Sequence, residues 1–473
     1  MPASRPFFLP QAEDDDFSVL HSAPKIAAPF PLRKSFLYGL IFLLWLCFGI
    51  FGRDAWKPEE TLITAAIANY LQVETLLSLT TFGLENRPPL YLWLAAQLAA
   101  GTAVFLPLHE GARLANVLLL LAGFICTGLA VRRLYGTRTA WLALLLLVGC
   151  LGFVVRAHIL NFGVPAFFGM ALALLAVTIL ADENRRITRT FFCGGLIGLA
   201  AAFTLLACGA LPALVVLSAV AIVRKEQLPV LAVVAAFFVP VLLFARLNNI
   251  PLFAVADGRF DTPTTIFAGL SDVVRVMGWS LLPLLPLALY GLWHTRGRDL
   301  NRVLYFCLSA IAATVVVFFI QGSGQEDYYL LLPPLALVTA GMLRKLPDGT
   351  ASVMDFFALL IIGLGVVGGL WLCWAALYWG SPAPLAAFIA EMFVGYTLPP
   401  PSAIKITIAA VLTLGWVLLL VNFGRSNERA VVNWSCGVTL VWAIFNLLLV
   451  AYVDSGKSYR QPAEQLLAVV GDD

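Results

Sequence analysis

The sequence predicts an all-α polytopic membrane protein with about thirteen transmembrane helices. Of its 473 residues, 61% are hydrophobic and only 12% are charged, whereas soluble domains carry roughly 25% charged residues. Apolar runs recur from residue 35 to residue 453, and many approach the length of about 20 residues that a spanning helix needs. The net charge of +3 gives no reason to expect a nucleic-acid partner.

The apolar runs divide the chain into an N-terminal tail (1–34), a transmembrane domain (35–453) and a short polar C-terminal tail (454–473). The first outer loop, 52–113, is apolar enough to hold a helix along the membrane surface near 61–71 and a second apolar segment near 90–106. The expected spans are 35–51, 114–131, 140–155, 163–180, 191–208, 211–223, 228–245, 277–293, 303–320, 328–343, 356–379, 406–421 and 431–453.

The distribution of basic residues sets the orientation, because Lys and Arg concentrate in short cytoplasmic loops. With the N-terminus inside, 19 of the 30 basic residues lie on the inner side and 16 of the 27 acidic residues lie outside. The stretch 191–223 is short for two crossings, but a single crossing would invert every later loop. We therefore predict two crossings with a turn near Gly209 and Pro212, which places the C-terminus outside.

The sequence GRDAWKPEE (52–60) gathers three acids, Asp54, Glu59 and Glu60, just after the first span. Acids in a helix's first turn complement its dipole, so capping is an alternative explanation for Glu59 and Glu60 but not for Asp54. A carboxylate at the membrane edge can deprotonate an acceptor hydroxyl, or hold an acceptor or a metal ion. Since Glu59 and Glu60 lie about 100° apart on a helix, we expect Asp54 and Glu59 to face a cavity and Glu60 to be closer to a structural role.

The sequence ENRPPLYLW (85–93) places Arg87 directly before a helix that two prolines open. The free N–H groups at such a helix start, together with a guanidinium group, favour binding of a phosphate. The alternative is an arginine that extends to the lipid headgroups.

Two further outer-face clusters contain polar and aromatic residues. QEDYYLLLPP (325–334) opens a span with Tyr328 and Tyr329, which also fit the aromatic belt of a membrane interface. RAHILN (156–161) is an outer turn whose single histidine is more typical of a loop residue than of a ligand. The eight cysteines all lie in apolar segments without a CxxC pair, so we predict neither disulfides nor a zinc site.

The order of these features is similar to a known family. One span, the acidic motif, an amphipathic helix, a basic residue before PPLYLW, the ARLANVLLLLAG span and RRLYG follow one another. The chain thus resembles the GT-C glycosyltransferases, in particular bacterial relatives of the lipid A aminoarabinose transferase and of the protein O-mannosyltransferases. The similarity is clearest over 52–136 and recurs over 328–341.

The resemblance implies a GT-C fold, a polyprenyl-phosphate sugar donor, and inverting transfer to a lipid, glycan or protein acceptor on the outer face of the bacterial inner membrane. The implied catalytic residues are Asp54, Glu59 and Glu60, and the implied donor-phosphate ligands are Arg87, Lys57, Tyr328 and Tyr329. Candidates for the wall of the substrate cavity are Glu85, Arg156, His158 and Glu326.

The sequence also departs from the family pattern. Glu59 stands where relatives usually have Asp, and Arg87 replaces a Lys. The fourth span begins NFGVPAFF without the Asp that relatives often carry, and no C-terminal soluble domain follows the last span.

Two alternatives to a transferase stay open, a transporter or flippase of a lipid-linked sugar and an inactive scaffold of this fold. Transport sites tend to place ionisable groups near the membrane midplane, often in repeated halves. Here the charges lie at the outer ends of spans and no repeat is visible, which favours surface chemistry. No organic cofactor is indicated, and a divalent metal ion held by the acids stays an open alternative.

The charge distribution generates a test of the topology. Reporter fusions placed after Arg138, Arg302 and Arg429 should all report the cytoplasmic side, because each follows a loop rich in basic residues. An outer-face signal after Arg302 together with a cytoplasmic signal after Arg138 would show that 191–223 crosses the membrane only once.

Overall fold

A computed structural model of the chain describes residues 32–181, 187–222, 228–252, 274–275, 277–294, 302–321, 327–343, 348–392, 399–422 and 427–470. Within these ranges every regular element is helical, which confirms the predicted all-α class. Seven of the described helices are long and apolar enough to cross a membrane. Shorter apolar helices accompany them, as in other polytopic membrane proteins.

The first half of the chain extends from α1 to α10. Its helices are α1 (Leu32–Cys47), α2 (Glu59–Val73), η1 (Leu76–Thr80), α3 (Leu90–Thr102), α4 (Leu108–Tyr135), α5 (Thr137–Val148), α6 (Leu151–Arg156), α7 (Gly163–Leu180), α8 (Ile187–Cys208), α9 (Ala210–Leu217), η2 (Ser218–Ile222) and α10 (Pro229–Leu247).

The second half contains two π-helical stretches, η6 and η7, inside long membrane helices. Its described helices are α12 (Leu284–His294), α13 (Arg302–Gln321), η4 (Asp327–Leu331), α14 (Leu332–Ala340), α15 (Asp348–Phe357), η6 (Ala358–Val367), α16 (Gly368–Trp379), α17 (Ala383–Met392), α18 (Ala403–Asn422), α19 (Asn427–Ile444), η7 (Phe445–Leu449), α20 (Val450–Lys457) and α21 (Arg460–Val470).

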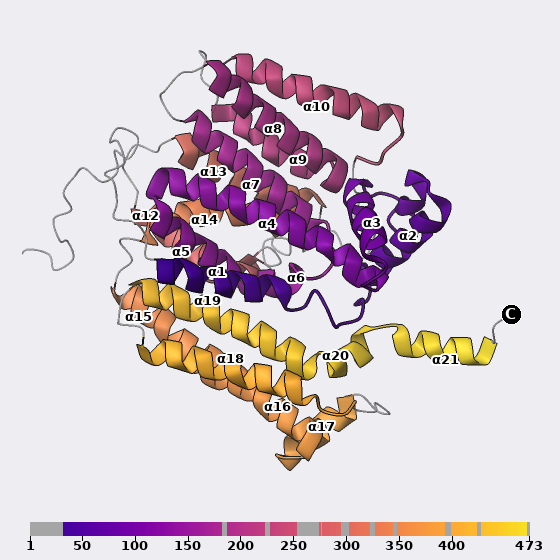
Figure 1. Cartoon of the computed structure of the whole chain (residues 1–473). Coiled ribbons are helices and arrows are strands. Elements are labelled where there is room, and N and C mark those ends of the chain that lie inside the picture. Colours follow the sequence, from indigo (N-terminus) through magenta and orange to yellow (C-terminus); the bar gives the residue numbers. More distant parts are fainter. Residues whose placement is uncertain are drawn as a thin grey trace, which may run out of the picture.

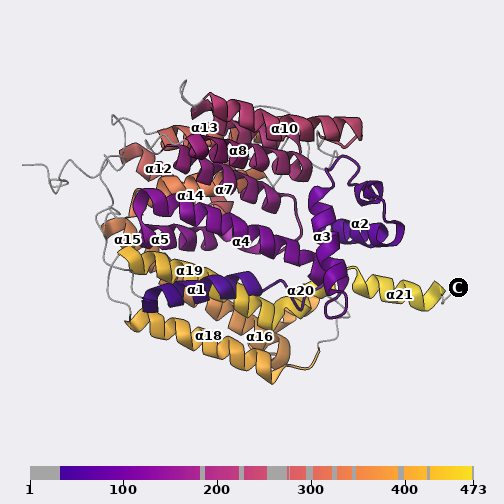
Figure 2. The same cartoon turned by 45° about the horizontal axis from the view of Figure 1, so that its top comes forward.

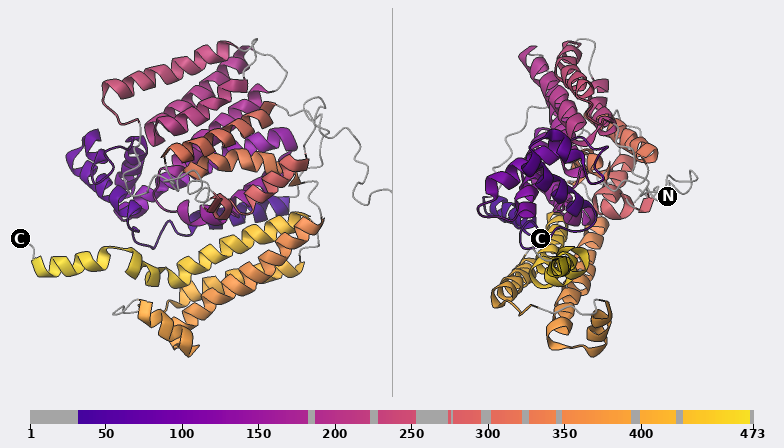
Figure 3. Two further views of the ribbon diagram at one scale, coloured as in Figure 1. Left: turned by 180° about the vertical axis from the view of Figure 1, so that it is seen from behind. Right: turned by 90° about the vertical axis from the view of Figure 1, so that its right-hand side faces the viewer.

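The long helices lie side by side and share one general direction, with α7 buried along nearly its whole length (Figure 1). The first-loop helices α2 and α3 lie beyond the ends of these helices, on one side of the bundle (Figure 2). Seen from behind, α20 and α21 continue past the same end (Figure 3). The first loop and the C-terminal segment therefore meet at one end of the bundle.

Described helices overlap all thirteen expected spans, but the third span is broken. The expected helix 140–155 is divided into α5 and α6 at Gly149 and Cys150. The indole of Trp434 on α19 donates a hydrogen bond of 2.8 Å to the carbonyl of Gly149, and a Cβ at Gly149 would lie 2.7 Å from that ring. Close packing against α19 thus accompanies the break, and the hydropathy of this stretch does not reveal it.

The turn expected within 191–223 is present in the hairpin of α8 and α9. The α8 helix is long and apolar enough to cross a membrane, and α9 is a shorter apolar helix. Gly209 links these helices at φ +109 and ψ −178, a conformation that is essentially restricted to glycine. The amide of Ala210 donates a 2.7 Å hydrogen bond to the carbonyl of Leu252, which follows α10. The turn of the hairpin and the end of α10 therefore lie at the same end of the bundle, as two crossings require.

At the opposite end of the bundle, Glu428 at the start of α19 connects α19 to α1 and α5. Its buried carboxylate accepts hydrogen bonds from Lys34 (2.9 Å), from Arg138 (2.6 Å) and from the hydroxyl of Tyr38. Basic residues from loops that we expect to be cytoplasmic therefore gather at one end. Which membrane face this end occupies stays a prediction.

Candidate active site

The centre of the first outer loop is a buried carboxylate, Glu60, held between two arginines. Its oxygens lie 2.8 Å from Nη1 of Arg53 and 2.7 Å from Nε of Arg113, and all three side chains are fully buried. The carboxylate also accepts hydrogen bonds from the amides of Trp56 (2.9 Å) and Leu160 (3.3 Å). Glu60 therefore joins α2, α4, the loop after α1 and the turn after α6.

The remaining guanidinium donors satisfy backbone carbonyls. Arg53 donates to the carbonyls of Gly49 (2.9 Å) and His158 (2.6 Å), and Arg113 donates to those of Ile50 (3.0 Å) and Asp54 (2.7 Å). Two cations share one carboxylate here, and carbonyl oxygens stabilise the excess positive charge.

The electrostatics of this group keep Glu60 ionised. Burial alone would raise its pKa, but Arg113 and then Arg53 outweigh burial and hold the pKa at about 2. Burial also lowers the pKa of Arg53, and Glu60 opposes this effect. An ionised carboxylate whose oxygens are already engaged by two guanidinium groups is poorly suited to accept a proton from a substrate.

The start of α4 holds the loop of residues 52–56 from one side. Glu110 accepts a 2.7 Å hydrogen bond from the amide of Gly52, and Nε2 of His109 lies 3.1 Å from the carbonyl of Arg53. Together with Arg113, these residues fix the backbone on which Asp54 lies.

The C-terminal segment holds the same loop from the other side. Oδ2 of Asp454 accepts a hydrogen bond from the amide of Asp54 (3.2 Å), and Oδ1 accepts one from the indole of Trp56 (2.7 Å). Nη1 of Arg460 lies 3.0 Å from Oδ1 of Asp54, whose side chain is 16% exposed. Asp54 thus differs from Glu60, because its carboxylate is partly open to solvent.

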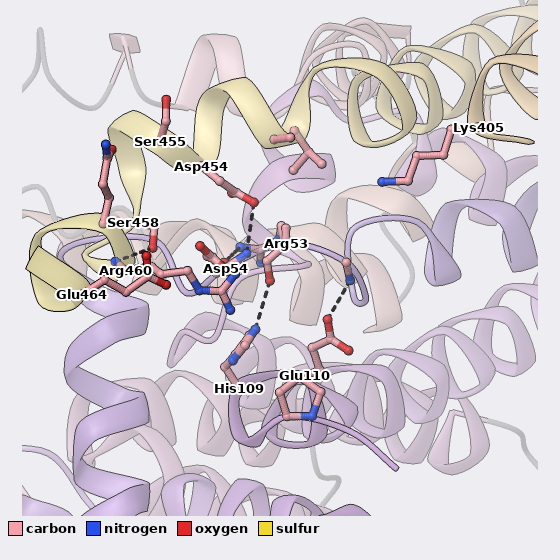
Figure 4. A pocket seen from close by; sticks show the side chains of 15 residues that line it. Arg53, Asp54, His109, Glu110, Lys405, Asp454, Ser455, Ser458, Arg460 and Glu464 are labelled. Carbon is pink, nitrogen blue, oxygen red and sulfur yellow. Dashed lines mark hydrogen bonds and ion pairs between the residues drawn. The ribbon is translucent and has the colours of Figure 1, made fainter. Parts of the chain in front are cut away.

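Asp54 borders a polar pocket of about 540 Å³ between the first loop, α4, α20 and α21. Figure 4 shows Asp454 reaching this loop from α20, while His109 and Glu110 reach it from α4. Lys405, at the start of α18, lies at the edge of the pocket. Of the three acids in the sequence GRDAWKPEE (52–60), only Asp54 lines the pocket. The lining mixes carboxylates with cations, so the pocket suits a polar, hydroxylated group.

An apolar groove of about 280 Å³ lies beside this pocket. Phe445, Trp442 and Leu370 contribute to its lining, with Lys457 as its one charged lining residue. Trp56 lines the groove while its indole nitrogen binds Asp454, a residue of the polar pocket. The polar and the apolar space therefore share one boundary at the end of the bundle.

The other first-loop candidates lie outside the polar pocket. Glu59 forms an ion pair of 3.3 Å with Arg156, and both side chains are partly exposed. Nζ of Lys57 lies 5.1 Å from the centre of the Tyr459 ring, over its face. Glu85 is exposed, and hydrogen bonds from its own amide and from that of Gly83 lower its pKa.

Arg87 is half-buried directly before α3, where the sequence placed it. Its guanidinium carbon lies 4.8 Å from the centre of the Phe162 ring, a cation–π arrangement. The α3 helix begins at Leu90, so the positive end of its dipole lies three residues after Arg87. This position retains the features of an anion site.

The remaining candidates are buried or lie outside the described residues. Tyr328 and Tyr329 are buried in the bundle, and the hydroxyl of Tyr328 donates to the carbonyl of Gly152 at 3.1 Å. His158 is fully buried, with Nε2 2.7 Å from the carbonyl of Trp45, so its ring is engaged within the core. Glu326 lies outside the described residues. Among the residues that are described, no group of three or more His, Cys, Asp or Glu side chains could hold a metal ion.

Sequence reasoning missed the residues that complete the site. No sequence pattern gives a role to Arg53 or Arg113, and hydropathy places the segment from Asp454 to Arg460 in a polar tail. The sequence offers one signal, the acid Asp454, which directly follows the last expected span and therefore lies at the edge of the membrane.

Comparison with solved structures shows a similar architecture in ArnT from Cupriavidus metallidurans. The apo structure of ArnT from Cupriavidus metallidurans matches over 88% of this chain and 76% of that chain, with 18% identity and a TM-score of 0.61. The structure of the same protein bound to undecaprenyl phosphate matches over 91% and 79%, with 18% identity and a TM-score of 0.63. No protein-family model and no curated protein sequence matches the chain. The likeness shows that the two chains share a fold, in agreement with the predicted all-α polytopic class.

The buried ion pairs generate a stability prediction. Glu60→Gln should lower the free energy of unfolding by about 3–5 kcal/mol, because it leaves two buried cations without a counter-charge. Thermal unfolding in detergent measures this, with the exposed Glu391→Gln on α17 as the control.

Since the pKa of Glu60 falls from 4.5 to about 2 on folding, its contribution to stability is complete above pH 4.5 and is lost as the pH falls towards 2. Equal acid sensitivity of wild type and Glu60→Gln in that window would contradict the assignment.

Proposed function

We propose that this chain is a membrane glycosyltransferase that uses a polyprenyl-phosphate-linked sugar. The observation that carries the proposal is the position of Asp54, a partly exposed carboxylate in a polar pocket that adjoins an apolar groove. A lipid-linked sugar has a polar head and a hydrocarbon tail, so a site with these two neighbouring environments suits it. The ArnT fold, seen in one structure with undecaprenyl phosphate bound, supports this choice of donor.

The reaction assigns Asp54 the role of base or of acceptor-positioning group. The Asp54 carboxylate takes the proton of an acceptor hydroxyl, and the freed oxygen attacks the anomeric carbon of the donor sugar. The bond between that carbon and the phosphate oxygen breaks, and polyprenyl phosphate leaves with the electron pair. Attack opposite the leaving group inverts the anomeric configuration. Glu60 takes no proton in this scheme, because both arginines hold it as a carboxylate.

Arg87 is the proposed ligand of the donor phosphate, at the start of α3. Glu59 and Arg156 form a second charged pair on the first loop and its neighbouring turn, and they are proposed to border the donor rather than the acceptor. We place this site on the outer face of the bacterial inner membrane. The acceptor is a lipid, glycan or protein hydroxyl.

Loss of the Asp54 charge tests the proposed chemistry. Asp54→Asn keeps the shape of the side chain but removes the base, so transfer should fall by about a hundred- to ten-thousand-fold. The measurement uses right-side-out vesicles of bacterial inner membrane that contain the protein, with radiolabelled undecaprenyl-phosphate sugars added. The vesicles' own lipids and glycans serve as acceptors.

The exposed Glu391→Gln is the matched control, and it should transfer at the wild-type rate. Sugar movement across the membrane without transfer would identify a transporter instead. Neither movement nor transfer in the wild type, with any donor offered, would leave an inactive scaffold. A wild-type rate in Asp54→Asn would remove Asp54 from the chemistry.

Arg87 is tested by binding of undecaprenyl phosphate alone, which needs no acceptor. Arg87→Ala should weaken binding by about ten- to a hundredfold, because hydrogen bonds to charged groups contribute about 1.5–3 kcal/mol. Arg87→Lys should retain part of the affinity, since it keeps the charge but not the bidentate geometry. The exposed Arg246→Ala at the end of α10 is the control. Unchanged affinity in Arg87→Ala would place the phosphate elsewhere.

A further inference from the structure

The last membrane helix supplies a carboxylate to the first outer loop. One carboxylate oxygen of Asp454 accepts a 3.2 Å hydrogen bond from the amide of Asp54, and the other accepts a 2.7 Å hydrogen bond from the indole of Trp56. Asp454 therefore fixes both ends of the three-residue segment that carries Asp54. It also lines the polar pocket together with Asp54, so these two carboxylates border the same space.

Arg460 supplies the cation of this group. Its guanidinium lies 3.0 Å from Asp54, and its position is set by the start of α21. There, the hydroxyl of the buried residue Ser458 accepts a 2.9 Å hydrogen bond from the amide of Arg460, which restrains the first residue of α21.

Neither helix capping nor stability explains Arg460. A cation in the first turn of a helix is opposed by the helix dipole, which favours acids there. The Arg460 side chain is 62% exposed, and exposed ion pairs of this kind contribute about 0–1 kcal/mol. The remaining explanation is that the Arg460 guanidinium orients the Asp54 carboxylate beside the pocket.

We propose that Asp454 and Arg460 are positioning residues that hold the Asp54 carboxylate over the polar pocket for reaction with the acceptor. This inference rests on the proposed glycosyl transfer and deepens it. Asp454 fixes the backbone beneath Asp54, and Arg460 fixes the carboxylate itself. The C-terminal segment is then part of the active site, on the acceptor side, while the donor phosphate is bound at Arg87.

The kinetic test uses the vesicle assay with radiolabelled undecaprenyl-phosphate sugar. Asp454→Asn and Arg460→Gln should each lower the maximal rate by about ten- to a hundredfold, the scale of a small misplacement of a catalytic group. The apparent KM for the donor and the affinity for undecaprenyl phosphate should stay at wild-type values. Arg460→Lys should restore most of the rate, because it keeps the charge beside Asp54. Glu391→Gln and Arg246→Gln are the charge-matched controls.

A double-substitution cycle decides whether the two residues act through Asp54. In the Asp54→Asn background, Arg460→Gln and Asp454→Asn should cause no further loss of rate, since the group that they position is gone. Losses that multiply with that of Asp54→Asn, or wild-type rates in both single variants, would overturn the proposal while leaving glycosyl transfer intact.

Folding controls keep these outcomes separate. Arg460→Gln should change the free energy of unfolding by no more than about 1 kcal/mol, so a rate loss in this variant is not a folding defect. A lower thermal stability of Arg460→Gln that accounts for its rate loss would give Arg460 a structural role and overturn the proposal. If the wild type transfers no sugar from any donor, the proposed function fails, and this inference fails with it.

Discussion

The end of the bundle that carries the candidate site depends on one buried interaction, the pairing of Glu60 with Arg53 and Arg113. Charges without exposure to water are costly unless each is paired and hydrogen-bonded. Here the carbonyl of Ile50, after α1, and the amide of Leu160, after α6, are among the groups that supply hydrogen bonds. The loop that carries Asp54 can leave regular helix because its backbone is bound by these fixed charges.

This arrangement divides the first-loop acids by environment. Glu60 is fully enclosed by cations, whereas Asp54 is partly exposed beside a pocket. Two acidic residues within seven positions of the sequence therefore lie in different environments. Trp56 adds a second division, because one face of its ring borders apolar space and its nitrogen binds a carboxylate. A substrate with a charged head and a hydrocarbon tail meets both environments within one short segment.

Hydropathy was sufficient to locate the apolar helices, since burial in lipid or among helices depends on each segment's own composition. It was not sufficient for the break at Gly149, which depends on Trp434, 285 positions later. The candidate site divides in the same way. Local motifs marked Asp54 and Arg87, but the role of Asp454 follows from a contact across 400 positions that no local pattern records. Helix geometry separated Glu59 from Glu60, whereas only the fold shows which arginines Glu60 meets.

The contact between Asp454 and the loop of Asp54 also sets an order of events during synthesis. Chains are made and begin to fold from the N-terminus, so the acids of the first loop are inserted long before the last membrane helix exists. Until that helix arrives, the amide of Asp54 and the indole of Trp56 lack their carboxylate partner. A nascent chain therefore carries an incompletely bonded first loop, and the polar pocket is complete only when that loop meets the last membrane helix.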